Sequence, residues 1–341
     1  MSPVGAASAA LQKAWLKRGL LACLLWPVSQ LYRAVSALRT QLYRSGVLES
    51  TPVGVPVIVV GNVVVGGAGK TPLIIALAEH LTAIGIAAGV VSRGYGRSSE
   101  ACLEVTPGST LAEAGDEPLL IRRRTGVPVF VARQRVDAAR ALLAAYPATR
   151  VLLCDDGLQH HALQRDLEIV VFDDRGVGNG WLVPAGPLRE SWPSNRPASN
   201  APSVLVLHTG HHPAFDGFRS SRRLADHAID ATGRKTSLAG LVDRRLVATA
   251  GIANPEVFFE MLRAGGLSLE ETRALPDHDD FSGFSFAGLD GATLLCTEKD
   301  AVKLFSLPKT QGTEVLAVPL VFSAEPAFMQ AFNARLAALL P

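Results

Sequence analysis

A glycine-rich segment separates an apolar strand pattern from a helical pattern early in the chain. The strand pattern occupies residues 55–60, the helical pattern occupies residues 73–81, and the segment between them contains Gly66-Gly67-Ala68-Gly69-Lys70-Thr71. In this setting glycines let backbone N–H groups turn toward phosphate oxygens, a lysine reaches the outer phosphates and a threonine hydroxyl can bind Mg²⁺. The segment therefore predicts a phosphate-binding loop (P-loop) for a nucleotide. The residues expected around the phosphates are Val64, Val65, Gly66, Gly67, Ala68, Gly69, Lys70 and Thr71.

The loop is a variant of the usual G-x-x-x-x-G-K-[ST] pattern. Val64 occupies the position of the first glycine. A glycine-rich turn with a merely solvated lysine would look similar, but the strand before it and the helix after it favour the nucleotide-binding interpretation.

Size and charge limit the class of protein. The 341 residues are 48% hydrophobic and 19% charged, enough for a sizeable core and about two domains. A net charge of only +2 gives no general basic field, so nucleic acid is not indicated as a partner. The four cysteines lie far apart without a C-x-x-C spacing, which indicates neither a zinc site nor a disulfide framework.

The first 48 residues predict a basic amphipathic helix, broken near Pro27. Apolar residues recur at helical spacing from Leu31 to Leu42, and arginines fall between them. The longest uncharged stretch, residues 19–32, is shorter than the roughly 20 residues of a spanning helix, and no signal-peptide cleavage site follows it. The pattern suits a helix that lies on a membrane surface and, equally, a helix that packs on the protein.

Strand and helix patterns alternate after the P-loop. Strands are expected at 87–91, 127–131, 151–154, 167–172 and 203–207, with helices near 118–124 and 135–145 between them. Alternation of this kind predicts an α/β, P-loop NTPase-like fold with a mainly parallel sheet flanked by helices. A Gly-, Pro- and Ser-rich stretch at 174–202 precedes a second α/β pattern. We therefore expect an N-terminal helix at 1–48, a core domain at 49–210 and a smaller α/β domain at 211–341.

Two carboxylates, Asp155 and Asp156, follow the apolar strand at 151–154. Two acids at a strand end are often just a polar turn. Beside a P-loop in the same sheet, however, they take the form of acids that hold Mg²⁺. The sequence does not decide which of the two dominates.

Three further loops carry polar groups. Asp116 precedes a helix, where it is either an N-cap or a general base for a hydroxyl group. Arg189 and Glu190 lie on a proline-rich loop and suit a phosphate clamp and a Mg²⁺ contact. A third loop, which is similar to the base-reading loops of nucleotide-binding proteins or is an ordinary capped helix start, carries Thr297, Glu298 and Asp300.

Taken together, these motifs resemble the tetraacyldisaccharide 4′-kinase family of lipid A (lipopolysaccharide) biosynthesis. The order and spacing run across nearly the whole chain. The matching segments are residues 65–72, 92–97, 115–118, 155–160, 182–190, 276–278 and 297–303.

The resemblance implies ATP-dependent phosphorylation of the 4′-hydroxyl of a tetraacylated disaccharide 1-phosphate, giving lipid IVA, at the cytoplasmic face of the bacterial inner membrane. It implies that Asp116, partnered by His278, accepts the hydroxyl proton, and that Lys70 contacts the phosphates. The implied Mg²⁺ ligands are Thr71, Asp156 and Glu190, with Asp155 beside them. Tentative substrate residues are Arg93, Tyr95, Gln159 and His160. No obligate protein partner is expected.

Two positions depart from the family pattern. Leu158 stands where an aromatic residue is common, and Asp279 where a second histidine often follows.

Two rival functions stay open. One is a membrane-associated nucleotide switch that hydrolyses ATP or GTP without a small-molecule acceptor. The other is a different small-molecule ATP-dependent ligase or kinase on the same fold. A candidate base at Asp116 together with a membrane-seeking helix favours the kinase.

Overall fold

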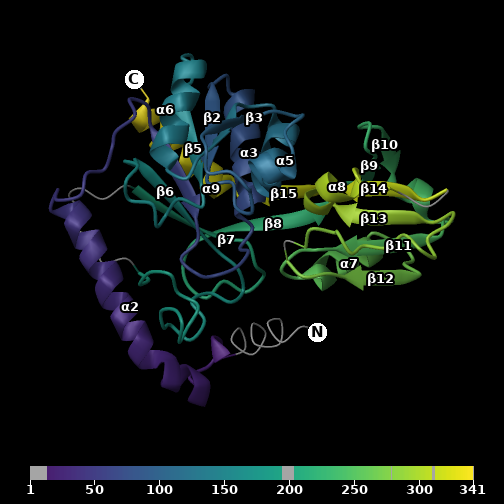
Figure 1. The fold of residues 1–341 in the computed structure, drawn as a ribbon, viewed down its shortest axis with the longest axis horizontal. Coiled ribbons are helices and arrows are strands. Elements are labelled where there is room, and N and C mark those ends of the chain that lie inside the picture. Colours follow the sequence, from purple (N-terminus) through teal and green to yellow (C-terminus); the bar gives the residue numbers. More distant parts are fainter. Residues whose placement is uncertain (1–13, 194–202, 278, 309–311, 341) are drawn as a thin grey trace.

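The computed structural model describes residues 14–193, 203–277, 279–308 and 312–340. It contains a nine-stranded and a six-stranded sheet of mostly parallel strands with helices on their faces, which we call the larger and the smaller sheet unit (Figure 1). A long N-terminal helix extends from the larger sheet unit. The parallel strands with helices on both faces, and the loop between β1 (Val57–Gly61) and α3 (Lys70–Ala83), confirm the predicted α/β, P-loop NTPase-like fold class.

The larger sheet has nine strands in the order β15-β8-β7-β6-β1-β5-β2-β4-β3. Strands β1, β2, β4, β5, β6 and β7 run parallel, β3 is antiparallel at one edge, and β15 pairs antiparallel with β8 at the other. The strands are β1 (Val57–Gly61), β2 (Ala88–Ser92), β3 (Leu103–Val105), β4 (Val129–Val131), β5 (Val151–Asp155), β6 (Leu167–Phe172), β7 (Ser203–His208), β8 (Phe218–Leu224) and β15 (Leu320–Ala324). Its helices are α3 (Lys70–Ala83), α4 (Leu111–Ala114), α5 (Asp116–Thr125), α6 (Arg135–Ala145) and α9 (Pro326–Leu339).

Strand β1 lies at the centre of this sheet and is buried on both faces. Alternate residues point to opposite faces: Ile58 joins the core cluster that contains Leu77 of α3, and Val59 joins the cluster that contains Leu142 of α6. A strand covered on both sides reads as an unbroken apolar run, which is why the sequence pattern locates it.

The smaller sheet has six strands in the order β10-β9-β14-β13-β11-β12. These are β9 (His227–Ile229), β10 (Lys235–Ser237), β11 (Leu246–Ala250), β12 (Glu271–Ala274), β13 (Thr293–Thr297) and β14 (Glu314–Val318). A 3₁₀ helix (Leu238–Leu241), α7 (Pro255–Ala264) and α8 (Glu298–Leu304) accompany them. The division at residue 210 stays a prediction; strands β8 and β15 and helix α9, which follow that residue, belong to the larger sheet unit.

Helix α2 (Leu20–Arg44) runs through Pro27 without interruption, so the predicted break is wrong. Proline removes one backbone donor, but its ring here lies on the exposed side, and contacts on either side of it hold the helix. Trp26 packs on Trp181, with ring centroids 6.4 Å apart, and the Ser29 hydroxyl donates to the Leu182 carbonyl at 2.6 Å. By length and composition α2 could cross a membrane, which the short uncharged stretch did not predict.

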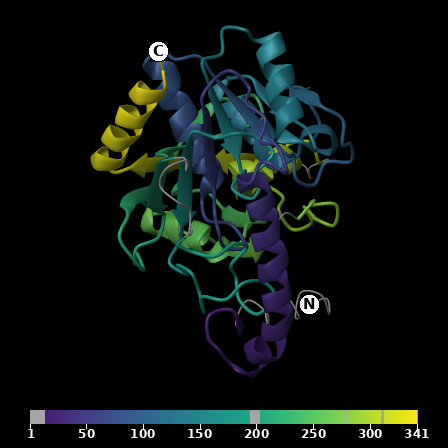
Figure 2. The same ribbon diagram turned by 90° about the vertical axis from the view of Figure 1, so that its left-hand side faces the viewer.

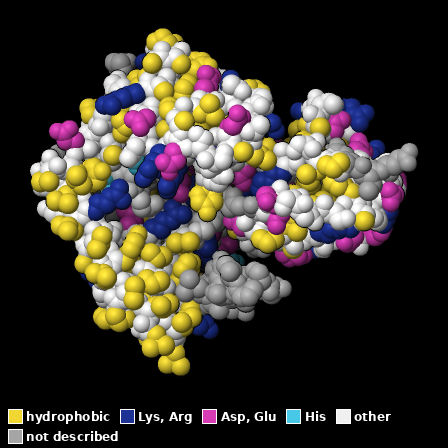
Figure 3. Space-filling model, in the orientation of Figure 1, with side chains coloured by type: hydrophobic (Ala, Val, Ile, Leu, Met, Phe, Trp, Pro, Cys, Tyr) yellow, Lys and Arg dark blue, Asp and Glu magenta, His cyan; other side chains and the backbone are white. Residues whose placement is uncertain are grey.

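Most of the surface of α2 is apolar and faces away from the protein. Figure 2 shows the helix extending from the body of the molecule, and Figure 3 shows hydrophobic side chains covering the same region, with Lys and Arg side chains gathered above them. The large apolar side chains that are exposed on this helix are Leu20, Leu21, Leu24, Trp26, Val28, Leu31, Tyr32, Val35 and Leu38.

Candidate active site

The predicted site loops meet at one edge of the larger sheet. Strand β1 pairs in parallel with β5 and β6, and β5 pairs in parallel with β2. Because parallel strands end at the same edge, the loop after β1, Ser92 at the end of β2 and Asp155 at the end of β5 lie together. This edge is where open α/β sheets bind ligands.

The glycines of the P-loop take conformations that other residues adopt only with strain. Gly66 has φ +103° and Gly69 has φ +83°, and Gly69 is the residue before α3. Lys70 and Thr71 therefore form the first turn of α3, where backbone N–H groups are free to bind an anion. The Thr209 hydroxyl supports the loop by donating to the Ala68 carbonyl at 2.9 Å.

Val64 is an integral part of the loop despite replacing a glycine. It is 1% exposed and forms an antiparallel bridge with Leu188. Hydrogen bonds flank the bridge, from Val65 N to Pro187 O at 2.8 Å and from Arg189 N to Val63 O at 2.7 Å. These backbone hydrogen bonds hold the proline-rich loop against the P-loop, which brings Arg189 to the site.

Asp156 lies between two cations. Lys70 Nζ is 3.5 Å from Asp156 Oδ1, and Arg189 Nη1 is 3.1 Å from both carboxylate oxygens. Burial raises the pKa of Asp156, but Lys70 and Arg189 outweigh it and hold the pKa below its usual range. Lys70 also donates to Asn62 Oδ1 at 3.2 Å, and Asn62 donates to the Gly66 carbonyl at 2.9 Å.

Asp155 has the opposite electrostatic environment. It is 2% exposed, and burial, together with the charges of Glu117 and Asp156, raises its pKa to about 7. Its Oδ2 accepts a hydrogen bond from the Ser92 hydroxyl at 3.1 Å. Its Oδ1 is buried and has no hydrogen-bond partner among the described residues. A buried oxygen without a partner carries a desolvation cost that a bound cation would remove.

The oxygen-bearing residues at this edge fit a nucleotide-bound Mg²⁺. The described residues contain no group of three or more His, Cys, Asp or Glu side chains arranged as a metal cage. Mg²⁺ instead usually takes one or two carboxylates and completes its shell with water and phosphate oxygens. Asp155 and Asp156 provide such carboxylates, and Thr71 provides a hydroxyl in the first turn of α3. Glu190 is held by Gln159, whose Nε2 donates to Glu190 Oε1 at 2.7 Å.

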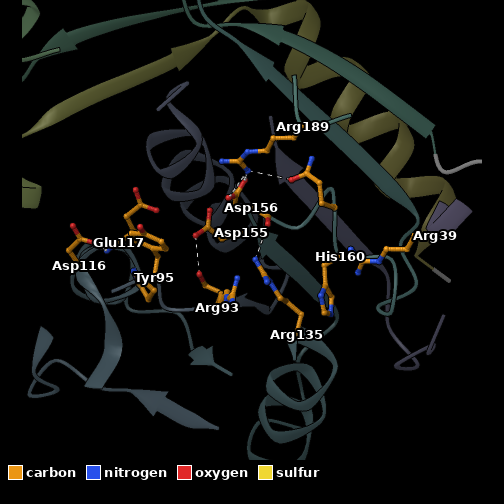
Figure 4. A pocket seen from close by; sticks show the side chains of 13 residues that line it. Arg39, Arg93, Tyr95, Asp116, Glu117, Arg135, Asp155, Asp156, His160 and Arg189 are labelled. Carbon is orange, nitrogen blue, oxygen red and sulfur yellow. Dashed lines mark hydrogen bonds and ion pairs between the residues drawn. The ribbon is translucent and has the colours of Figure 1, made fainter. Parts of the chain in front are cut away.

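A cavity of about 330 Å³ lies next to Asp155, Asp156 and Arg189. Figure 4 shows Asp116 and Glu117 on one side, Arg39 and His160 on the opposite side, and Asp155 between them. All four tentative substrate residues line it. The lining residues are Arg39, Ser92, Arg93, Tyr95, Asp116, Glu117, Pro118, Arg135, Asp155, Asp156, Gln159, His160 and Arg189.

The end of the cavity near α2 is strongly basic. An adjoining hollow is lined by Arg39, Arg93, Arg133 and Arg135 together with His160. Burial, followed by the charges of Arg135, Arg165, Arg39 and Arg93, lowers the pKa of His160 to about 4. Its imidazole is therefore neutral at pH 7. A neutral ring among guanidinium groups suits an anionic ligand with phosphate geometry.

Asp116 is the first residue of α5 and is 7% exposed. Lys303 Nζ lies 3.5 Å and Lys299 Nζ 3.7 Å from its Oδ2. Its predicted partner His278 lies outside the described residues.

The predicted nucleotide residues at the start of α8 have partners within the protein. Asp300 is fully buried, and its Oδ2 accepts hydrogen bonds from Gly251 N at 3.0 Å and the Thr297 hydroxyl at 2.6 Å. Glu298 Oε1 and Oε2 each lie 2.6 Å from Arg124 Nη1. Their contact with ATP stays a prediction.

Several site residues were not singled out from the sequence. Asn62 lies in the glycine-rich segment after the predicted strand at 55–60, and Ser92 directly follows the predicted strand at 87–91, so both carried a positional signal. Arg39 and Arg135 carried none, because each begins or lies within a helix far along the chain from the P-loop.

The chain is similar in sequence and in fold to tetraacyldisaccharide 4′-kinases. The family model described as tetraacyldisaccharide-1-P 4′-kinase matches residues 21–337. A tetraacyldisaccharide 4′-kinase of Polaromonas sp. strain JS666 is 63% identical over 328 residues, covering 96% of each chain. One from Polaromonas naphthalenivorans is 60% identical over 330 residues, 97% of this chain and 95% of that one. The crystal structure of LpxK from Aquifex aeolicus in complex with ATP is similar with a TM-score of 0.78 and 27% identity, over 94% of this chain and all of that one.

Proposed function

Because this chain belongs to the tetraacyldisaccharide-1-P 4′-kinase family, we propose that its site acts as follows. The enzyme transfers the γ-phosphate of ATP to the 4′-hydroxyl of a tetraacyldisaccharide 1-phosphate, in lipid A biosynthesis. The observation that carries the proposal is the placement of Asp116 in the same cavity as Asp156, which Lys70 and Arg189 contact.

The P-loop side of the cavity binds the nucleotide. Backbone N–H groups at the start of α3 and the ammonium of Lys70 engage the β- and γ-phosphates, and Arg189 clamps the transferring group. When bound beside Asp155 and Asp156, Mg²⁺ neutralises charge on the phosphate oxygens. The ion pairs of Lys70 and Arg189 with Asp156 keep both cations at the site before the nucleotide arrives.

The other side of the cavity activates the acceptor. Asp116 takes the proton of the 4′-hydroxyl as the hydroxyl oxygen bonds to the γ-phosphorus; the bond to the bridging oxygen of ATP breaks, and ADP leaves. His278 is proposed as its partner.

The basic end of the cavity holds the substrate's 1-phosphate. Four arginines and a neutral histidine line the hollow there, and a planar guanidinium matches phosphate oxygens in a bidentate manner. Arg93 and His160 line both the cavity and the adjoining basic hollow, whereas Tyr95 and Gln159 line the cavity alone. In this proposal Tyr95 and Gln159 contact the sugar between the two ends of the cavity.

Helix α2 brings this end of the cavity to the bilayer. Leu24 is 77% and Leu31 67% exposed, and Arg39 of the same helix lines the cavity. An apolar face next to a basic pocket suits a substrate whose acyl chains stay in the membrane while its sugar enters the site. We place the enzyme at the cytoplasmic face of the inner membrane, where ATP is available.

The test is transfer of label from γ-³²P-ATP to a detergent-dispersed acylated disaccharide 1-phosphate by the purified full chain. Label in the lipid fraction, absent without the acceptor, supports the kinase. Label released only as inorganic phosphate contradicts it and favours a nucleotide switch. A disaccharide with a blocked 4′-hydroxyl is the matched control and should accept no label.

A further inference from the structure

Two lysines of α8 reach across from the smaller sheet unit to Asp116. Lys299 and Lys303 are four residues apart, so their side chains share one face of the helix. Helix α8 packs against α5, which Asp116 begins. Both ammonium groups are largely buried, with side chains 16% and 8% exposed.

The same lysines hold both neighbours of residue 278. Lys299 Nζ lies 3.4 Å from Asp277 Oδ1. Lys303 Nζ donates to the Asp279 carbonyl at 2.7 Å and lies 5.9 Å from the centroid of the Phe281 ring. Asp277, through its side-chain carboxylate, and Asp279, through its backbone carbonyl, are thus linked by the two lysines of α8 to the carboxylate of Asp116.

We propose that Lys299 and Lys303 are positioning residues that hold Asp116 beside Asp277 and Asp279 and keep its carboxylate ionised for the acceptor hydroxyl. The inference rests on the proposed function of Asp116 as the base. A buried carboxylate beside a second acid tends to hold a proton, whereas cations within about 4–6 Å favour its charged form. Only the charged form can accept the proton of a sugar hydroxyl.

The charges around Asp116 come from several elements. Glu117 lies beside it on α5, the two lysines lie on α8, and Asp277 lies on the loop before residue 278. Burial lowers the pKa of Lys299, but Glu117, Asp116 and Asp277 outweigh it and raise the pKa overall, so the ammonium stays charged. The other charged or titratable groups that face the same cavity are Arg39, Arg93, Tyr95, Arg135, Asp155, Asp156, His160 and Arg189.

A double-mutant cycle on the full chain tests the proposal. Lipid transfer is measured with ATP and Mg²⁺ for the native enzyme, Asp116→Ala, Lys303→Met and the double variant. Lys303→Met should lower kcat roughly 10- to 100-fold, the usual effect of removing a group that orients a site residue, with the KM for ATP little changed. In the Asp116→Ala background the same substitution should have no further effect, because it acts through Asp116.

The pH profile gives a second readout that a merely structural role would not move. Loss of a cation raises the pKa of a nearby carboxyl, so the acidic limb of kcat should shift to higher pH in Lys303→Met, and Lys303→Arg should move it back. Lys299→Met should shift it in the same direction, and serves if Lys303→Met does not fold. Lys235→Met, on the exposed strand β10, is the matched control.

The outcomes test the positioning role of the lysines and the role of Asp116 as the base separately. Losses that multiply in the double variant, or an acidic limb that stays in place in the folded lysine variants, overturn the positioning role while the base assignment stands. Full transfer by Asp116→Ala overturns the base assignment, and the positioning role with it.

Discussion

The guanidinium of Arg189 lies 3.1 Å from both carboxylate oxygens of Asp156. The two residues are brought together because the Arg189 N–H donates to the carbonyl of Val63, just before the P-loop. Lys70 approaches the same carboxylate at 3.5 Å. The two cations that we propose for phosphate binding and one proposed metal ligand therefore form a single cluster. Substitution of each member should have a different effect on the reaction.

Lys70→Ala should impair ATP binding itself. A charge-assisted hydrogen bond contributes about 1.5–3 kcal/mol, so we expect the KM for ATP to rise roughly 10- to 100-fold, with a fall in kcat. Steady-state kinetics at varied ATP concentration measure both. Retained full activity would count against the whole P-loop assignment. Lys235→Met again provides an exposed control of the same residue type.

Asp116→Ala should act on turnover and leave ATP binding nearly intact. General bases contribute about 10²–10⁴-fold, and we expect a fall in kcat of that size, measured by lipid labelling at saturating ATP. Asp137→Asn, an exposed residue on α6, should leave kcat unchanged. Nearly unchanged transfer by Asp116→Ala would show that another group takes the proton.

The sheet edge that carries the site could be predicted from the sequence, because local patterns determine it. Buried parallel strands read as apolar runs, and their carboxyl ends meet. The P-loop and the acids at 155 and 156 follow such runs directly, and the structure brings them into contact through Lys70 and Asp156. Helix α2 was likewise predicted, except for its continuity through Pro27, which depends on tertiary contacts of Trp26 and Ser29.

The contacts that join distant segments could not be predicted, because no local pattern encodes them. Arg189 reaches Asp156 only through backbone pairing of its loop with residues 63–65. Lys299 and Lys303 look like ordinary solvated lysines of an amphipathic helix, and only the packing of α8 on α5 brings them to Asp116. Sequence spacing also does not reveal that Glu298 is paired with Arg124.

Asp155 should make the stability of the Mg²⁺-free enzyme depend on pH. Its pKa is raised to about 7 by burial, Glu117 and Asp156, so the folded state binds the proton more tightly than the unfolded chain, whose Asp pKa is about 3.9. The stabilisation is fully present below the unfolded pKa and is lost as pH rises through about 7. Thermal unfolding in EDTA should therefore show a Tm that falls between pH 5 and pH 8.

The Asp155→Asn variant isolates this contribution. Since the amide does not ionise, the fall in Tm between pH 5 and pH 8 should be smaller than in the native chain. Asp243→Asn, which makes the same change at an exposed position, should keep the native pH dependence. An Asp155→Asn protein with the same pH dependence as the native chain would assign the titration to another group.

Arg124 and Glu298 should be energetically coupled across the two sheet units. Glu298 contacts Arg124 Nη1 through both carboxylate oxygens, and its Oε2 also accepts a hydrogen bond from Leu320 N at 3.2 Å. Contacting pairs couple by roughly 0.5–3 kcal/mol, and we expect a value in this range from a cycle of Arg124→Met and Glu298→Gln in urea unfolding. The exposed pair Arg133–Glu100 should give about 0–1 kcal/mol. Additive effects at Arg124 and Glu298 would contradict the coupling.

Leu24→Glu with Leu31→Glu should detach the enzyme from membranes without unfolding it. The two side chains are 77% and 67% exposed, so neither contributes much to the core. Burying a leucine side chain in an apolar phase contributes about 1.5–3 kcal/mol, and each lost side chain should therefore weaken membrane binding roughly tenfold or more. Sedimentation with anionic phospholipid vesicles measures the shift from pellet to supernatant, and labelling of detergent-dispersed substrate should persist, because the cavity is unchanged. Val242→Glu, at an exposed position in the smaller sheet unit, should sediment like the native chain. If the double variant still sediments fully with vesicles, α2 does not provide the attachment, and the basic cavity must reach the lipid by another surface.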